Sequence, residues 1–188
     1  MFKKFIGLAF ISMVVLFSTG CTTLSQVNAL DDGAIPAYKK MFYEVLEDGD
    51  PAKAMMDEYK IADEITNEDV ASSIKDLAEE YNMMLTGDVK MFTKDDAKDE
   101  EVKHARIFSL CSLHIAKKFL NHSRYFGGFM PCRIMLVEYG NGDRYLITMD
   151  LTLAIHGGTP LPKEMLELAQ SVQKAMVAIP KQSASGDF

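Results

Sequence analysis

The residues of this 188-residue chain best suited to chemistry are three cysteines, four histidines and a few methionines. Cys111 and Cys132 are separated by 20 residues, and three interpretations stay open: a disulfide, two structural thiols, or a functional thiol or metal site. A disulfide across that loop would stabilise the fold by roughly 3 kcal/mol in the chain-entropy model. Copper(I) selects soft ligands. One candidate metal set is therefore Cys111, Cys132, Met149 and His156.

Two histidines lie close in sequence to residues that could form a functional site with them. His114 follows Cys111 by three positions, which would place both side chains on one face of a helix, although a satisfied or exposed histidine explains it more simply. His156 precedes the Gly157-Gly158 turn and is the histidine to test first, the alternative being a loop histidine bonded to nearby backbone. The methionines of the expected helices and strands are interpreted as core filler.

Signatures of the common enzyme classes do not occur in the sequence. It has no G-x-S-x-G or H-E-x-x-H motif, no glycine-rich phosphate loop and no C-x-x-C-H haem attachment motif. The acidic stretch 93–103 lacks the D-x-D-x-D-G pattern of a calcium loop, so a solvated charged loop is the favoured interpretation. No cofactor is firmly predicted, and a non-catalytic protein is favoured over an enzyme.

The amino terminus has the three zones of an export signal. Lys3 and Lys4 precede an apolar run over 5–17, which is too short to span a bilayer as a helix. The sequence Ser18-Thr19-Gly20-Cys21 then resembles the lipobox of bacterial lipoproteins, with Ser18 where an aliphatic residue is usual. The resemblance implies removal of residues 1–20, lipid attachment at Cys21 and membrane anchoring through that lipid. The alternative is an ordinary signal peptide with a free Cys21.

The residue after Cys21 and the charge of the mature chain refine the expected location. Thr22 is not aspartate, which by resemblance to the sorting rule of Gram-negative envelopes favours the outer membrane, facing the periplasm. Removal of Lys3 and Lys4 leaves 18 basic and 27 acidic residues, so the net charge changes from −7 to −9. A nucleic-acid partner is not expected, because it would require a basic surface.

The spacing of apolar residues predicts an α+β fold, with an antiparallel sheet and the two longer helices on one face. The expected segments are a tether over 22–36, a helix over 38–46, a strand over 55–61 (or a helix over 52–62), a helix over 67–81 and strands over 83–92 and 104–110. They continue with a short helix over 111–121, strands over 132–139 and 144–150, a helix from 159–162 to Pro180, and a polar tail over 181–188. The order of the body is therefore β-α-β-β-α-β-β-α.

Two local signals support this order. Thr66 and Asp69 form a capping-box variant before the helix over 67–81, and Asn141-Gly142 is typical of a hairpin turn. The strand over 132–139 has apolar side chains on both faces. In a sheet with one solvent-exposed face, apolar and polar side chains would alternate along the strand. We therefore expect its second face to be covered by the amino-terminal helix, a second subunit or a ligand.

Several short motifs resemble the bacterial family called domain of unknown function 302. They are the run 129–134, Thr148-Met149-Asp150-Leu151, the run 155–158 and Cys111, although Ser112-Leu113 replaces the Asn-Pro found after this cysteine in many members. The resemblance covers about residues 53–180, after an anchoring region over 21–52. It implies a small TBP-like α+β fold that can be dimeric, and no settled activity.

Two functions follow as hypotheses. The first is an exported lipoprotein whose non-catalytic domain binds a protein partner, a second copy of itself or a small apolar ligand. The second is a thiol redox or soft-metal handling protein that uses Cys111 and Cys132.

Overall fold

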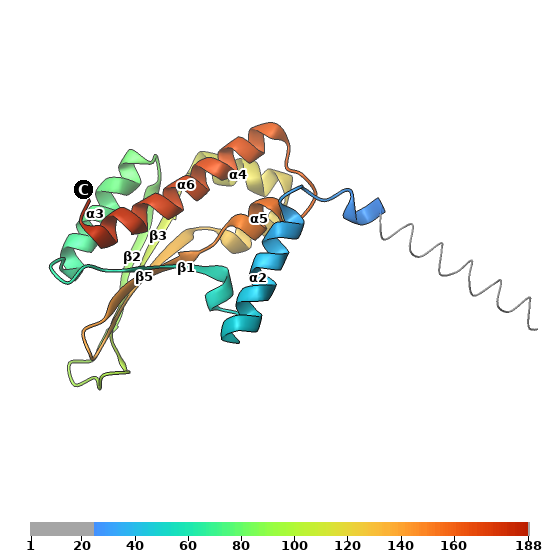
Figure 1. Cartoon of the computed structure of the whole chain (residues 1–188). Coiled ribbons are helices and arrows are strands. Elements are labelled where there is room, and N and C mark those ends of the chain that lie inside the picture. The colour runs from blue at the N-terminus through green and yellow to red at the C-terminus, as the bar shows by residue number, and fades with distance from the viewer. Residues whose placement is uncertain (1–24, 188) are drawn as a thin grey trace, which may run out of the picture.

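The computed structural model describes residues 25–187 and shows a five-stranded antiparallel sheet in the order β1-β5-β4-β3-β2 (Figure 1). The strands are β1 Met56–Lys60, β2 Met84–Thr93, β3 Val102–Cys111, β4 Cys132–Tyr139 and β5 Arg144–Met149. The expected signal segment 1–20 and Cys21 lie outside the described residues.

Two long helices, α3 and α6, pack against each other and cover one face of the sheet (Figure 1). The helices are α2 Ala34–Asp48, η1 Lys53–Met55, α3 Asn67–Glu80, α4 Leu113–His122, η2 Arg124–Phe129, α5 Thr152–His156 and α6 Lys163–Ser185. The predicted order β-α-β-β-α-β-β-α is confirmed for the body, with α2 before it and α5 inserted ahead of α6. Within the described range, no helix combines the length and the apolar character needed to cross a bilayer.

The capping box at the start of α3 forms as predicted. The Thr66 hydroxyl accepts the backbone N–H of Asp69 at 3.1 Å, and the Asp69 carboxylate accepts the backbone N–H of Thr66 at 3.0 Å. The helix then buries Val70, Ile74 and Leu77 against the sheet. Burial of each such side chain stabilises the fold by about 1.5–3 kcal/mol.

The hairpin between β4 and β5 also forms as predicted. Gly142 adopts φ +90°, and the Asn141 side chain accepts the backbone N–H of Asp143 at 2.9 Å. The two strands carry Ile134, Leu136 and Leu146 to the helix-covered face, where all three are fully buried.

A buried arginine joins α3 to β2 and β3. Arg106 is only 7% exposed, and its guanidinium donates two hydrogen bonds to Asp88, at 2.7 and 2.8 Å, and one to Glu68 at 3.0 Å. Lys90 also contacts Glu68 at 2.9 Å, and together the two cations lower the pKa of Glu68 to about 2. The guanidinium also lies 5.1 Å from the centre of the Phe108 ring. Two carboxylates and one aromatic ring therefore stabilise its positive charge.

The end of the last helix differs from the expectation. Pro180 lies inside α6, which continues to Ser185, so the expected polar tail is largely helical and packed on the body. The hydroxyls of Ser183 and Ser73 are 2.9 Å apart in the core, and the Ala184 carbonyl accepts the backbone N–H of Ala62. These contacts offset the roughly 3 kcal/mol cost of a proline within a helix.

Cys111 is the last residue of β3 and not the start of a helix. It pairs with Met84 of β2, and α4 begins two residues later at Leu113. Strand β2 also extends to Thr93, which pairs with His104, and β3 begins at Val102, which pairs with Tyr139 of β4, so the expected charged loop is shorter. The apolar period of the sequence did not predict these strand ends, because pairing with a neighbouring strand extends each strand beyond that period.

The expected tether ends earlier than residue 36. The backbone N–H of Asp31 donates to the Gly158 carbonyl at 2.8 Å, and α2 starts at Ala34, which is completely buried. The Tyr38 hydroxyl donates to the Gly157 carbonyl at 3.0 Å. Hydrogen bonds to the turn after α5 hold this segment on the domain. The sequence did not predict them, because the bonded residues are more than 100 positions apart.

The second face of the sheet is not covered by α2. That helix packs on η1 and α5, beside the sheet. Val89 and Phe92 of β2 are about half exposed on this face, and Met135 and Ile147 of the central strands are partly exposed. Of the three expected covers, the structure therefore does not bear out the amino-terminal helix, and a second subunit or a ligand stays a prediction.

Candidate functional site

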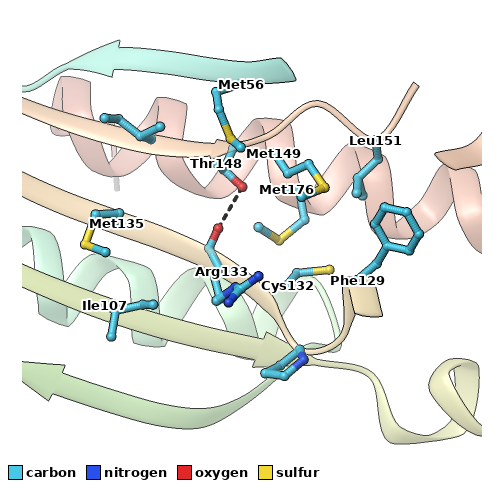
Figure 2. A pocket seen from close by; sticks show the side chains of 12 residues that line it. Met56, Ile107, Phe129, Cys132, Arg133, Met135, Thr148, Met149, Leu151 and Met176 are labelled. Atoms are coloured by element: carbon cyan, nitrogen blue, oxygen red, sulfur yellow. Dashed lines mark hydrogen bonds between the residues drawn. The ribbon is translucent and has the colours of Figure 1, made fainter. Parts of the chain in front are cut away.

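A cavity of about 230 Å³ opens where β4 and β5 separate. The two strands are paired only as far as Ile134 and Thr148, whereas β4 stays paired with β3 to Cys132 and β5 stays paired with β1 to Met149. The Thr148 hydroxyl donates to the Arg133 carbonyl at 2.9 Å at the point of separation (Figure 2). The cavity therefore begins at this side-chain hydrogen bond, where the backbone pairing of β4 with β5 ends.

Sulfur atoms line much of this cavity. Five of the lining residues carry sulfur: Met56, Cys132, Met135, Met149 and Met176. Figure 2 shows the sulfur atoms of Cys132, Met149 and Met176 on the side of the Thr148 hydrogen bond where Leu151 and Phe129 lie, and the side chain of Met56 beside Thr148. They come from four elements, β1, β4, β5 and α6, which only the tertiary fold brings together.

The rest of the lining is mostly apolar. Its carbon surface comes from Ile107, Phe129, Pro131, Ile147 and Leu151. The two lining residues with polar side chains are Arg133, which is exposed, and Thr148, whose hydroxyl is already bonded to backbone. Among the described residues, none that lines the cavity carries a carboxylate or imidazole that could act as a general acid or base.

The two cysteines lie on neighbouring strands as free thiols. Cys132 is opposite Leu110, so its side chain points to the helix-covered face, and Cys111 points to the other face because side chains alternate along a strand. This arrangement does not support the disulfide interpretation. Burial raises the pKa of Cys132 to about 11 and also raises the pKa of Cys111. Neither thiol has the lowered pKa of a reactive cysteine.

His156 lies outside the cavity and contacts the amino-terminal segment. Its Nδ1 is 2.9 Å from a carboxylate oxygen of Asp31, which also accepts the Gly33 backbone N–H at 2.8 Å. The Gly33 hydrogen bond and then His156 hold the pKa of Asp31 below its usual range. A Cβ at Gly33 would come within 3.1 Å of the His156 ring, so the approach is close. The role of His156 here is to hold the start of α2.

The candidate metal set from the sequence is therefore divided. Cys132 and Met149 line the cavity, whereas Cys111 and His156 do not. Met56 and Met176 were missed because their spacing indicates only apolar positions of a strand and a helix. In the part of the chain that the structure describes, no three His, Cys, Asp or Glu side chains gather as they would around a metal ion.

The fold and the cavity define a two-layer α+β domain with a small, sulfur-lined site at one end of an open antiparallel sheet. The family model described as "Domain of unknown function DUF302" matches residues 59–179, which is most of the chain. The protein belongs to this family. The match confirms the resemblance seen in the motifs of the sequence.

One solved structure resembles this fold along almost its whole length. It is described as the crystal structure of uncharacterized conserved protein DUF302 from Bacillus stearothermophilus, and the TM-score is 0.52 at 10% identity. The match covers 69% of this chain and 98% of the other. At that identity the likeness shows a common fold and nothing about activity. No curated protein matches the sequence.

Proposed function

We propose that this protein is a non-catalytic ligand-binding lipoprotein of the bacterial envelope, and that its site is the cavity between β4 and β5. The observation that carries the binding role is the cavity itself, about 230 Å³ in volume and lined almost entirely by apolar and thioether groups. An apolar cavity of about 150 Å³ can bind benzene. The site therefore suits a small apolar ligand, and flexible methionine side chains can adapt to its shape.

The chemistry of the wall supports binding without catalysis. The Thr148 hydroxyl is engaged with backbone, and the Cys132 thiol stays protonated near neutral pH because burial raises its pKa to about 11. The thiol redox hypothesis is disfavoured for a related reason, since Cys111 and Cys132 point to opposite faces of the sheet. Soft-metal binding is supported as the second candidate function, because five of the residues that line the cavity carry sulfur.

The envelope location is supported by the sequence. Lys3 and Lys4, the apolar run over 5–17 and the small residues before Cys21 are the parts of a lipoprotein signal. In this proposal the lipid on Cys21 holds the domain on the periplasmic side of the outer membrane. The net charge of −9 keeps the body away from anionic headgroups.

A second copy of the chain is the proposed cover of the open sheet face. Val89 and Phe92 are about half exposed there, on the outer strand β2. Light scattering of the detergent-solubilised chain is expected to give a dimer mass, and Phe92→Glu a monomer. A wild-type monomer would contradict the proposed dimer.

The ligand-binding role is tested by titrating the full chain with indole. Methionine methyl groups labelled with ¹³C serve as reporters, and the signals of Met149 and Met176 should shift with saturation while that of Met165 does not. Ile147→Trp should fill the mouth of the cavity and weaken binding at least tenfold. Tyr145→Trp, two residues away on the same strand face, is the matched control and should leave binding unchanged. Shifts that never saturate, or that persist in Ile147→Trp, would remove the support for this site.

A further inference from the structure

The sulfur atoms of the cavity form a set that no short sequence motif encodes. Met56 and Met149 are direct cross-strand partners on β1 and β5 and lie on the open face of the sheet, whereas Cys132 points to the helix-covered face. The two sets reach one cavity because β4 and β5 separate there. Cys132 comes from the start of β4, and Met176 comes from α6 and is 2% exposed. All four side chains line the same cavity (Figure 2).

The donor chemistry of the wall is unusually uniform. Calcium and magnesium bind oxygen ligands, and zinc is bound mainly by thiolate, imidazole and carboxylate groups. Among the described residues of the cavity wall, none carries a carboxylate or imidazole, and the neutral Thr148 hydroxyl, which donates its proton to the Arg133 carbonyl, is the one side-chain oxygen. Thiolate and thioether groups, which make up the other metal-binding side chains, are selective for soft cations.

We propose that the cavity binds one soft monovalent cation, copper(I) or its analogue silver(I), through the Cys132 thiolate and the thioethers of Met149, Met176 and Met56. This inference rests on the proposed binding role of the cavity and develops its second candidate function, soft-metal binding. It replaces the metal set expected from the sequence, since Cys111 and His156 take no part.

The charge balance of the site favours a cation with a single charge. Binding converts the Cys132 thiol and M⁺ into a sulfur–metal bond, and the displaced proton goes to solvent. One thiolate and one monovalent cation are neutral together, so no net charge is left in an apolar cavity. A divalent ion would keep one uncompensated positive charge near the Arg133 guanidinium. The thioethers complete the coordination without adding charge.

The experiment is a silver(I) titration of the full chain without oxygen, in a Cys21→Ser, Cys111→Ser background that leaves Cys132 as the remaining thiol. One silver ion should bind per chain and release one proton, as measured with an indicator dye. The ¹³C-methyl signals of Met149 and Met176 should shift together, while that of Met165 should not. Copper(I) affinity follows from competition with a coloured chelator.

Leucine variants separate a thioether ligand from apolar filler. Met149→Leu and Met176→Leu keep most of the volume and the apolar character of the side chain, so the midpoint of urea unfolding should change little. Each should weaken silver binding at least tenfold, and Cys132→Ser should abolish the proton release. Met165→Leu, on the same helix but outside the cavity, is the control and should change nothing.

The outcomes separate this inference from the proposed function. Unchanged silver affinity in both leucine variants, or binding without proton release, would overturn the metal site. If indole binds but silver does not, the ligand-binding role stands and the metal site fails. If neither binds, both fail. Silver binding without indole binding would support the metal site and remove the apolar-ligand role.

Discussion

Asparagine in place of Asp88 should destabilise the fold more than its partly exposed position suggests. Asp88 accepts two of the three hydrogen bonds that the Arg106 guanidinium makes, and Arg106 is 7% exposed. Breaking a fully buried ion pair costs about 3–5 kcal/mol. The Asp88 side chain is 34% exposed and Glu68 still contacts the arginine, so we expect Asp88→Asn to lower the free energy of unfolding by about 2 kcal/mol.

The double variant Asp88→Asn, Arg106→Met gives the sharper test. Methionine fills a similar space without a charge, so the double variant should be within about 1 kcal/mol of the wild-type protein. It should therefore be more stable than Asp88→Asn alone. Lys90→Met is the matched control, because Lys90 faces Arg106 across the ladder, contacts the same Glu68 and has a side chain that is 60% exposed. Its cost should be under about 0.5 kcal/mol.

Urea unfolding of the full chain, followed by circular dichroism, measures these differences provided that the slope with urea is unchanged among the variants. The reasoning about buried charge would be refuted by a double variant as unstable as the sum of its single changes. A cost for Asp88→Asn as small as that of Lys90→Met would also refute it.

Three further predictions concern the anchor, the start of α2 and the core. Cys21→Ser should abolish incorporation of labelled palmitate and move the protein out of the membrane fraction; incorporation that persists would contradict lipid attachment at Cys21. The pKa of Asp31 is lowered from 3.8, so its stabilising contact is present above that pH and is lost as the pH falls through the lower folded value. The Gly33 amide resonance should therefore move only below about pH 4, and Asp31→Asn should remove this transition. Ser183→Ala leaves the buried Ser73 hydroxyl without its partner and should cost about 1–3 kcal/mol in urea unfolding, more than the double change to alanine.

The parts of the fold that could be predicted were those with local causes. Thr66 and Asp69 satisfy backbone donors within a single turn, and Asn141-Gly142 meets the needs of one tight turn. In both cases the relevant atoms lie within a few residues of each other. The element order followed because the apolar period identifies strands and helices without tertiary information.

The parts that could not be predicted depend on contacts between distant residues. Proline at 180 is a local stop signal, but burial of Ser183 and Ala184 carries α6 past it. Met176 looks like any apolar helical position, and only the separation of β4 from β5 turns it into a cavity residue. The contact between His156 and Asp31 joins positions 125 residues apart.

That last contact determines how far the domain can stand from the membrane. If Cys21 carries the lipid as proposed, residues 22–30 separate the anchor from the first contact with α5, since Asp31 is already fixed there. Nine residues span at most about 30 Å even when fully extended, and the turns over 26–30 shorten this distance, whereas the expected tether over 22–36 would span up to about 50 Å. The start of α2 would then stay within about 30 Å of the anchor, and loss of the contact between Asp31 and His156 would allow the body to move further away.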